Sequence, residues 1–355
     1  MSVLTSLRQA EELEAILRAA SPRTLRGLRD FATREMRVAK GPAAGQRFSI
    51  HTQPYTRLLL DEIDRGIWPR VAVVGPIQSG KTTCGHIAPL MHTLFELGEG
   101  AIAGVPDLAT ADDKWREDIL PAITASSFRT MLPRRGAGAR GGKVKEAVVF
   151  RNGATLRFMS GGGNDARRSA YTARVLCVTE ADKLDETGGR SREADKITQM
   201  EGRTRAYGDR ALVVLESNAT TRAGRIWREY TDGTQSRIVC RCPHCAAWVT
   251  PDKDDFTGWQ DAEDEIAAMD RAAWLCPACK VILSESDRRG MNEGAVLAHR
   301  GQEVAPDGTV VGEIPRTRTL GFRWSAFNNM FVDARHLGAT LYAHTKDPDQ
   351  ENAEK

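Results

Sequence analysis

The chain has 355 residues, of which 27% are charged and 41% hydrophobic, and its formal net charge is +3. No run approaches the roughly 18 apolar residues that a membrane span needs, which predicts a soluble protein with no membrane partner. The length exceeds the roughly 100 to 200 residues usual for one domain, which predicts a large core plus a smaller unit. Residues 1–20 lack the basic-then-apolar order of a secretory signal, so we do not expect export.

The first forty residues predict two short helices joined at Ser21 and Pro22, because Ser favours a helix N-cap and Pro the first helical position. The second helix, over 23–40, carries an excess of basic residues. Such a bias is usually a solvated helix face, and contact with nucleic acid or a partner protein is the alternative. A further helix is expected over 53–64.

Short apolar runs, typical of buried parallel strands, then alternate with helical patterns. The strands are expected at 70–75, 101–105, 174–179 and 211–215, and the helices at 81–97, 109–123 and 192–205. Asn152 and Gly153 predict a hairpin between two further short strands. This alternation indicates a doubly wound α/β fold with a mainly parallel sheet.

Residues 75–82 read Gly-Pro-Ile-Gln-Ser-Gly-Lys-Thr, which fits the P-loop pattern G-x-x-x-x-G-K-[ST] between a strand and a helix. Glycines let backbone amides curl around phosphates, and a helix N-terminus favours anions. Lys81 is expected to reach the β and γ phosphates of ATP, and the Thr82 hydroxyl to bind Mg²⁺. A chance match in a glycine-rich turn is the alternative. The predicted nucleotide site comprises Gly75, Gln78, Ser79, Gly80, Lys81, Thr82 and Thr83.

Glu180 ends the apolar strand 174–179, where a carboxylate can polarise the attacking water as general base. An exposed strand-end acid without a catalytic role is the alternative. An Asp that holds the Mg²⁺ shell usually precedes this Glu, and here Thr179 stands in its place. Three explanations remain open: Thr179 reaches a water of the metal, Asp182 substitutes, or turnover is weak.

Two C-x-x-C pairs, Cys242 with Cys245 and Cys276 with Cys279, predict a tetrahedral structural Zn²⁺ site. A redox dithiol or unbound thiols are the alternatives. The long separation predicts a hairpin with an extended loop between the pairs. This loop is acidic, which disfavours DNA contact and favours a fold staple or a partner surface. The other cysteines and one histidine are expected to be buried hydrophobes or bystanders: Cys84, Cys177, Cys240 and His244.

The segment 131–145 is basic and glycine-containing, which favours phosphate contacts with DNA without sequence readout. A disordered polar loop is an equal alternative. The candidate DNA-binding residues are Arg134, Arg135, Arg140, Lys143 and Lys145, together with Arg203, Arg205 or Arg210 later in the chain.

Taken in order, these features resemble the ATPase part of the large terminase subunit of tailed phages, of the lambda-like GpA type. The resemblance covers about residues 22–350. It rests on Gln53–Arg57, Gln78–Thr82, Val105–Pro121, the Arg-bearing loop 161–169, Glu201–Arg205, Glu216–Thr220, the cysteine pairs and Leu320–Phe327.

The resemblance implies an ATP-hydrolysing motor that moves double-stranded DNA into a procapsid. It further implies a small terminase subunit and a portal as partners, a homo-oligomeric ring, and a virus- or prophage-encoded protein in the bacterial cytoplasm. A helicase-like or remodelling ATPase, or a zinc-ribbon nucleic-acid-binding protein with a decayed ATP site, are the alternatives. The implied site residues are Gln53 and Tyr55 at adenine, Arg168 or Arg167 as arginine finger, and Ser217, Asn218, Ala219 and Thr220 for coupling.

These interpretations divide the chain into four parts: a helical arm over 1–40, a P-loop ATPase core over 41–236, a zinc ribbon over 237–285, and a C-terminal segment of the ATPase region over 286–355. In the large terminases that this sequence resembles, a nuclease domain follows the motor. Too few residues follow Phe331 for such a domain, so nuclease activity is not expected from this chain.

Overall fold

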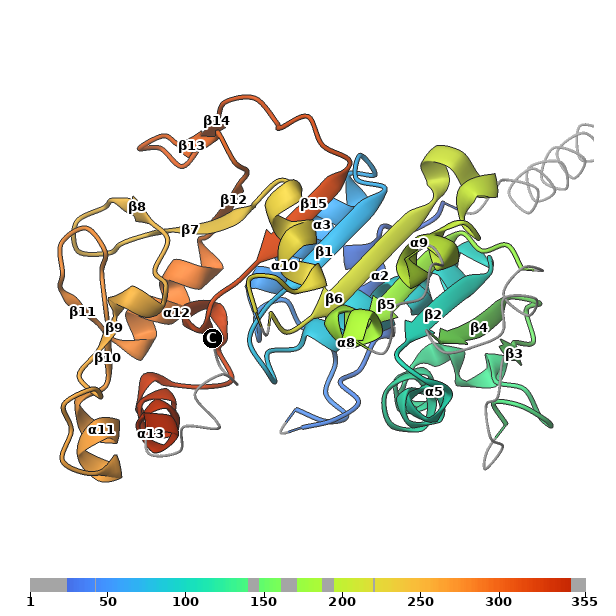
Figure 1. Ribbon diagram of the computed structural model, residues 1–355, viewed down its shortest axis with the longest axis horizontal. Helices are drawn as coiled ribbons and strands as arrows, with labels where there is room; N and C mark the ends of the chain where they lie inside the picture. The colour runs from blue at the N-terminus through green and yellow to red at the C-terminus, as the bar shows by residue number, and fades with distance from the viewer. Residues whose placement is uncertain are drawn as a thin grey trace, which may run out of the picture.

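A seven-stranded sheet forms the centre of the protein in the computed structural model, which describes residues 24–41, 43–139, 147–160, 171–186, 195–219 and 221–345 (Figure 1). The strand order is β15-β1-β6-β5-β2-β4-β3, and every pairing is parallel except that of β3 with β4. The strands are β1 (Arg70–Val74), β2 (Ala101–Val105), β3 (Ala147–Val149), β4 (Thr155–Ser160), β5 (Val175–Thr179), β6 (Leu212–Ser217) and β15 (Thr319–Arg323).

Helices cover both faces of this sheet, because successive strand residues point to opposite sides. Val71 and Val73 face one core cluster, and Ala72 and Val74 face the other. The first face carries α2 (Leu28–Glu35), α3 (Tyr55–Asp64), η1 (Thr82–Ile87), α4 (Ala88–Met91), η2 (His92–Leu97), α5 (Leu108–Lys114), η3 (Trp115–Ile119), α6 (Leu120–Ala125) and η4 (Ser127–Met131). The second carries α8 (Ala181–Glu186), α9 (Lys196–Glu201) and α10 (Arg225–Asp232). The predicted mainly parallel α/β architecture is confirmed.

The predicted strands and the hairpin at Asn152 and Gly153 are found where the sequence placed them. The helical run 81–97 is also present, with two π-helical stretches inside it. The helix expected over 192–205 is shorter: α9 is followed by the 3-10 turn η5 (Arg205–Arg210). The second N-terminal helix is shorter as well, because Gly27 and Met36 at its two ends have extended backbone. The first lies outside the described residues.

The basic residues in and just before α2 form ion pairs within the chain. Arg26 lies 2.6 Å from carboxylate oxygens of both Glu35 and Glu96, and Arg29 lies 3.0 Å from Asp61. Leu28 and Phe31 are buried in the core beneath. From residue 24 on, the segment predicted as a helical arm therefore packs on the core, and its charges are neutralised there.

After α10 the chain leaves the sheet and forms a second region that contains the cysteine pairs. Its sheets among the described residues are β12-β7-β8, β11-β10-β9 and the two-stranded β13-β14. The predicted extended loop between the pairs is wrong, because this stretch folds into short strands and a helix. The elements are β7 (Arg237–Arg241), β8 (Trp248–Val249), η6 (Lys253–Asp255), β9 (Phe256–Thr257), α11 (Glu265–Arg271), β10 (Ala273–Leu275), β11 (Ile282–Leu283), α12 (Glu285–Glu293), β12 (Val296–Ala298), β13 (Glu303–Val304) and β14 (Val310–Val311).

The chain then returns to the central sheet as β15, which pairs with β1 from Arg70 with Thr319 to Val74 with Arg323. The cysteine-containing region is therefore an insertion between β6 and β15. After β15 come η7 (Ala326–Asn328) and α13 (Ala334–Thr345), and α13 packs against α11.

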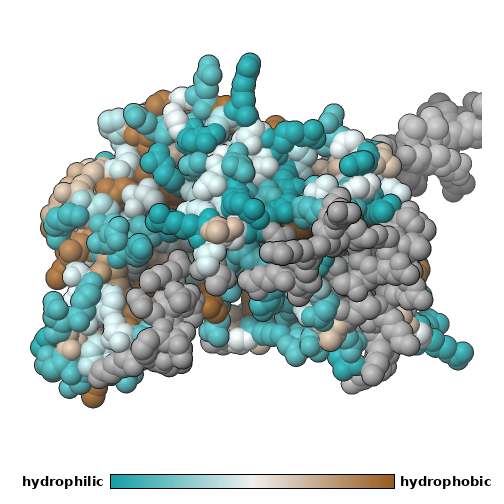
Figure 2. All heavy atoms as spheres, viewed as in Figure 1, coloured by the Kyte–Doolittle hydropathy of each residue, from teal (hydrophilic) through white to brown (hydrophobic). Residues whose placement is uncertain are grey.

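The insertion is fixed to the sheet by polar contacts. The Arg323 guanidinium donates two hydrogen bonds to Asp252, at 2.7 and 3.1 Å, and the Ser325 hydroxyl donates to the Pro251 carbonyl at 3.1 Å. The face seen in Figure 2 is largely hydrophilic, with hydrophobic spheres gathered at the end where the β11-β10-β9 sheet lies. Among the described residues, no helix has the length and apolar character that crossing a membrane requires.

Candidate nucleotide-binding site

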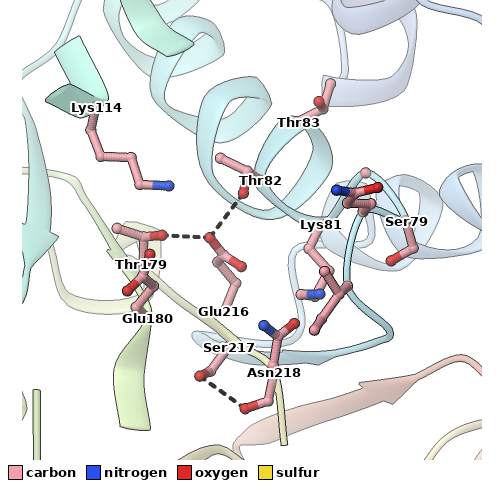
Figure 3. A pocket seen from close by; sticks show the side chains of 13 residues that line it. Ser79, Lys81, Thr82, Thr83, Lys114, Thr179, Glu180, Glu216, Ser217 and Asn218 are labelled. Carbon is pink, nitrogen blue, oxygen red and sulfur yellow. Dashed lines mark hydrogen bonds between the residues drawn. The ribbon is translucent and has the colours of Figure 1, made fainter. Parts of the chain in front are cut away.

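A pocket opens at the carboxyl ends of β1, β5 and β6 (Figure 3). In parallel α/β sheets this edge is where ligands bind, because the loops that follow the strands meet there. The pocket is lined by Ile77, Gln78, Ser79, Gly80, Lys81, Thr82, Thr83, Lys114, Thr179, Glu180, Glu216, Ser217 and Asn218. The structure thus brings together residues that lie far apart in the sequence.

The loop 75–82 makes a tight turn directly after β1. Gln78 has φ 53° and Gly80 has φ 96°, both in the left-handed region, and the Ser79 hydroxyl donates to the Pro76 carbonyl at 2.6 Å. Gly75 is required by packing, since a Cβ there would lie 2.2 Å from Cε2 of Trp324. Non-glycine residues at positive φ are uncommon and cluster at functional sites. The value at Gln78 therefore indicates that the surrounding structure holds this loop in a specific conformation.

Gln53 and Tyr55 contact this loop through hydrogen bonds to its backbone. The Tyr55 hydroxyl donates to the Ser79 carbonyl at 2.7 Å, and the Gln53 amide donates to the same carbonyl at 3.3 Å. Tyr55 also stacks on Trp324 with ring centroids 4.1 Å apart. Both side chains are buried and neither is among the residues that line the pocket. The contact with adenine implied for them stays a prediction.

Lys81 folds back over the loop and is 7% exposed. Its ammonium donates to the carbonyl of Gly75 at 2.8 Å and to that of Pro76. Burial lowers the pKa of Lys81 to about 8, although the charge of Glu216 opposes this shift. The lysine therefore has too little negative charge around it, and an anionic ligand would supply the missing charge.

Glu180 lies where the sequence placed it, immediately after β5 and at the edge of the pocket. Its φ is 52°, a strained value for this residue type, and its carboxylate pairs with Lys183 at 2.6 Å. Asp182 points elsewhere: it accepts a hydrogen bond of 2.7 Å from the Ile226 amide at the start of α10 and is not among the pocket residues.

Glu216 is a pocket residue that the sequence interpretation named only as the first residue of the segment resembling the coupling segment, with no role of its own in the site. It is 3% exposed, and its Oε1 accepts hydrogen bonds from Thr179 Oγ1 at 2.6 Å and from Thr82 Oγ1 at 3.3 Å. A charged residue that ends the apolar strand Leu212–Ser217 was the signal that could have found it. Lys114 was missed too, and in Figure 3 its ammonium extends toward Thr179 and Thr82.

The segment predicted to couple hydrolysis to movement begins at the end of β6. Ser217 and Asn218 line the pocket, and the Ser217 hydroxyl donates to the Asn218 carbonyl at 3.1 Å. Ala219 is the next described residue, and Thr220 lies outside the described residues, as do Arg167, Arg168, Arg140, Lys143 and Lys145. Arg134 and Arg135 are exposed.

The four thiols of the C-x-x-C pairs form a separate cluster. Their sulfur atoms all lie within 4.8 Å of one another, and Cys245 and Cys276 are 3.9 Å apart. Tetrahedral Zn–S bonds of about 2.3 Å would place sulfur atoms about 3.8 Å apart, so the cluster fits zinc. The two turns match: Ala246 and Lys280, each directly after the second cysteine, both have positive φ.

Cys240 and His244 are not part of this cluster among the described residues. Burial raises the pKa of the Cys240 thiol to about 12, and His244 lies 3.4 Å from Asp287. Cys84 and Cys177 are fully buried in the core, as expected. The cysteines that the sequence set apart as bystanders thus lie away from the thiol cluster.

The sheet, the glycine-containing loop and the strand-end acids define an α/β protein whose pocket suits a phosphate-bearing ligand. Residues 43–296 match the family described as phage terminase large subunit gpA, ATPase domain, and the chain belongs to this family. The family that the sequence features pointed to is therefore confirmed.

Among solved structures, the protein is similar to the large terminase of bacteriophage HK97. The two share 13% sequence identity with a TM-score of 0.42, over 59% of this chain and 41% of the HK97 chain. The aligned part thus spans less than half of that terminase. A comparison with curated proteins gives no match.

Proposed function

We propose that this chain is the ATP-hydrolysing motor of a viral DNA-packaging terminase, which couples Mg-ATP hydrolysis to translocation of double-stranded DNA into a procapsid. The observation that carries the proposal is the pocket, where the loop 75–82 faces the ends of β5 and β6. Membership of the terminase ATPase family supports the same activity.

In this mechanism the loop 75–82 binds the phosphates through its amides, and Lys81 turns from the carbonyls of Gly75 and Pro76 to the β and γ phosphates. Glu180 lies across the pocket from the loop, where its carboxylate accepts the proton of the attacking water. The pairing with Lys183 restrains that carboxylate.

The pocket also fits Mg²⁺, because oxygen atoms of hydroxyl and carboxylate groups gather beside Thr82, and these are the ligands Mg²⁺ prefers. Thr82 would hold the ion, which neutralises charge on the phosphates when bound. In the cysteine cluster, Zn²⁺ would be held by Cys242, Cys245, Cys276 and Cys279. Four sulfur ligands would leave such a zinc no open position for catalysis, so its role would be structural.

Ser217 and Asn218 touch the pocket from the end of β6, so they can sense the γ phosphate and pass its loss to the rest of the chain. A surface that grips DNA phosphates, including the exposed Arg134 and Arg135, would receive the movement. Force on DNA requires several subunits, so an assembled ring on a portal and a small terminase subunit complete the proposed machine.

The test is the ATPase rate of the purified chain with Mg²⁺, with and without double-stranded DNA. Lys81→Ala and Glu180→Gln should each lower the rate by about 10²- to 10⁴-fold. Glu263→Gln, which alters an exposed acid on the insertion, is the matched control and should leave the rate unchanged.

Two results would contradict the motor proposal. Hydrolysis that stays at background in the wild type, while the chain still binds nucleic acid, would favour a binding protein with a decayed ATP site. Unwinding of duplex DNA by the purified chain without a procapsid would favour a helicase-like ATPase.

A further inference from the structure

The unusual residue in the pocket is Thr179. In P-loop ATPases the loop Ser or Thr and an acid at the end of a nearby strand together hold Mg²⁺. At that strand end this chain has a hydroxyl in place of a carboxylate, directly before Glu180. Thr179 is fully buried, so its side chain is enclosed where the end of β5 meets the pocket.

A carboxylate reaches the same place from the neighbouring strand. Thr179 on β5 and Glu216 on β6 are register partners, so their side chains leave the same face of the sheet side by side. β6 lies between β5 and β1, and β1 leads into the loop that carries Thr82. A glutamate on β6 is therefore placed between the two threonines that flank the predicted metal position.

The hydrogen bonds of Glu216 match this placement. Its Oε1 accepts from the hydroxyls of both Thr179, at 2.6 Å, and Thr82, at 3.3 Å (Figure 3). A loop threonine whose hydroxyl meets a strand-end carboxylate is the arrangement that holds Mg²⁺ in these sites. Here the carboxylate comes from β6, the strand that lies directly beside β1.

If Glu216 had a purely structural role, its burial would lower the stability of the protein. The residue is 3% exposed, and a buried carboxylate is costly unless charges or hydrogen bonds compensate it. Among the described residues, its hydrogen-bond donors are two neutral hydroxyls, and Lys81 is the cation whose charge it affects. In a working site Lys81 moves to the phosphates, so a divalent cation is the group that completes the compensation.

We propose that Glu216 supplies the carboxylate that holds the Mg²⁺ of the nucleotide site, in place of the acid missing at position 179. Thr179 is a positioning residue that orients Glu216 by donating to its Oε1. The proposal rests on the proposed function, because it assigns a residue of the same ATP site.

The test measures equilibrium binding of a fluorescent, non-hydrolysable ATP analogue with excess Mg²⁺ and with EDTA. The quantity compared is the Mg²⁺ enhancement, the ratio of the two affinities. Glu216→Gln keeps an oxygen that can accept both threonine hydroxyls but removes the charge. It should lower the enhancement by about 10- to 100-fold, the range seen when support of a metal site is lost.

A double variant, Thr179→Asp with Glu216→Gln, moves the carboxylate to β5 and should restore the enhancement to near the wild-type value. A structural role for Glu216 predicts lower thermal stability of Glu216→Gln with an unchanged enhancement, and that result overturns the proposal. If Glu216→Gln does not fold, the double variant decides: a wild-type enhancement supports the assignment, and a lost enhancement overturns it.

Failure of the proposed function looks different. If the wild-type chain does not bind the analogue under either condition, the ATP site itself is refuted, and the assignment of Glu216 falls with it. If the wild type binds with a Mg²⁺ enhancement that Glu216→Gln retains in full, the ATP site stands and only the assignment of Glu216 is refuted.

Discussion

Replacing Arg288 by methionine should destabilise the protein by about 4 kcal/mol and lower the affinity of the proposed nucleotide site, which Arg288 does not touch. Arg288 lies on α12 in the insertion and is 1% exposed. Its guanidinium donates to four backbone carbonyls in the segment after β15. They belong to Phe327 at 2.9 Å, Val332 at 2.9 Å, Ala326 at 3.4 Å, and Asn329.

The magnitude follows from those four acceptors. A buried polar group left without its partner costs about 1–3 kcal/mol, and we take about 1 kcal/mol for each carbonyl because carbonyls tolerate partial satisfaction. The sum is about 4 kcal/mol. Burial lowers the pKa of Arg288, which shows that the native state bears a desolvation cost that methionine removes. That relief keeps the estimate within the range of about 3–5 kcal/mol for the loss of one partner of a buried charged pair.

The effect should reach the pocket through a continuous set of hydrogen bonds. Asn329 Oδ1 accepts from the Gln53 amide at 2.6 Å, and the Met330 amide donates to Gln53 Oε1 at 2.8 Å. Gln53 in turn donates to the Ser79 carbonyl in the loop at 3.3 Å. We therefore expect Arg288→Met to lower nucleotide affinity as well as stability.

The assay is urea unfolding, with the slope checked for constancy so that a shift in the midpoint reports stability. Arg289→Met is the matched control, because Arg289 is the next residue of the same helix and is exposed, and it should change stability by less than about 0.5 kcal/mol. The reasoning is refuted if Arg288→Met unfolds within about 1 kcal/mol of the wild type.

Three further predictions concern other parts of the chain. Burial lowers the pKa of Lys81 to about 8, so the charged form destabilises the free protein below that pH. Lys81→Met should therefore have a higher free energy of unfolding than the wild type at pH 7. This difference should shrink by up to about 3 kcal/mol as the pH rises from 7 to 10, as measured by urea unfolding at each pH. Gly75→Ala places a Cβ 2.2 Å from Trp324 and should cost about 1–3 kcal/mol in thermal unfolding. By contrast Gly290→Ala, with no atom within 4 Å of its Cβ, should not destabilise. Cys276→Ser should abolish bound zinc in elemental analysis and lower the melting temperature, and retained zinc would show that the thiol cluster is not the site.

The strands of the central sheet were predictable because both of their faces are buried. Parallel strands of this kind read as continuous apolar runs, and Arg70–Val74, Ala101–Val105 and Val175–Thr179 carry that signal locally. The loop 75–82 was predictable for a similar reason, since its pattern is contiguous in the chain.

Features that depend on distant partners were not predictable in the same way. The sequence interpretation placed no strand at β15, and nothing local indicates that Thr319–Arg323 pairs with β1. The place of Glu216 depends on the register of β5 with β6, which sets it beside Thr179. The brace formed by Arg288 joins helix and loop residues about 40 positions apart, and sequence spacing does not encode such contacts.

The position of β15 has a consequence for synthesis. Arg70 pairs with Thr319, 249 residues later in the chain, whereas its other strand neighbour, β6, is complete at Ser217. At roughly 5–20 residues per second, a ribosome needs roughly 12–50 s to make the intervening chain. During that time one edge of β1 has no strand beside it, and an open sheet edge can pair with other chains. The emerging protein therefore passes through a period in which the strand that leads into the loop 75–82 depends on chaperones or on the inserted region for cover.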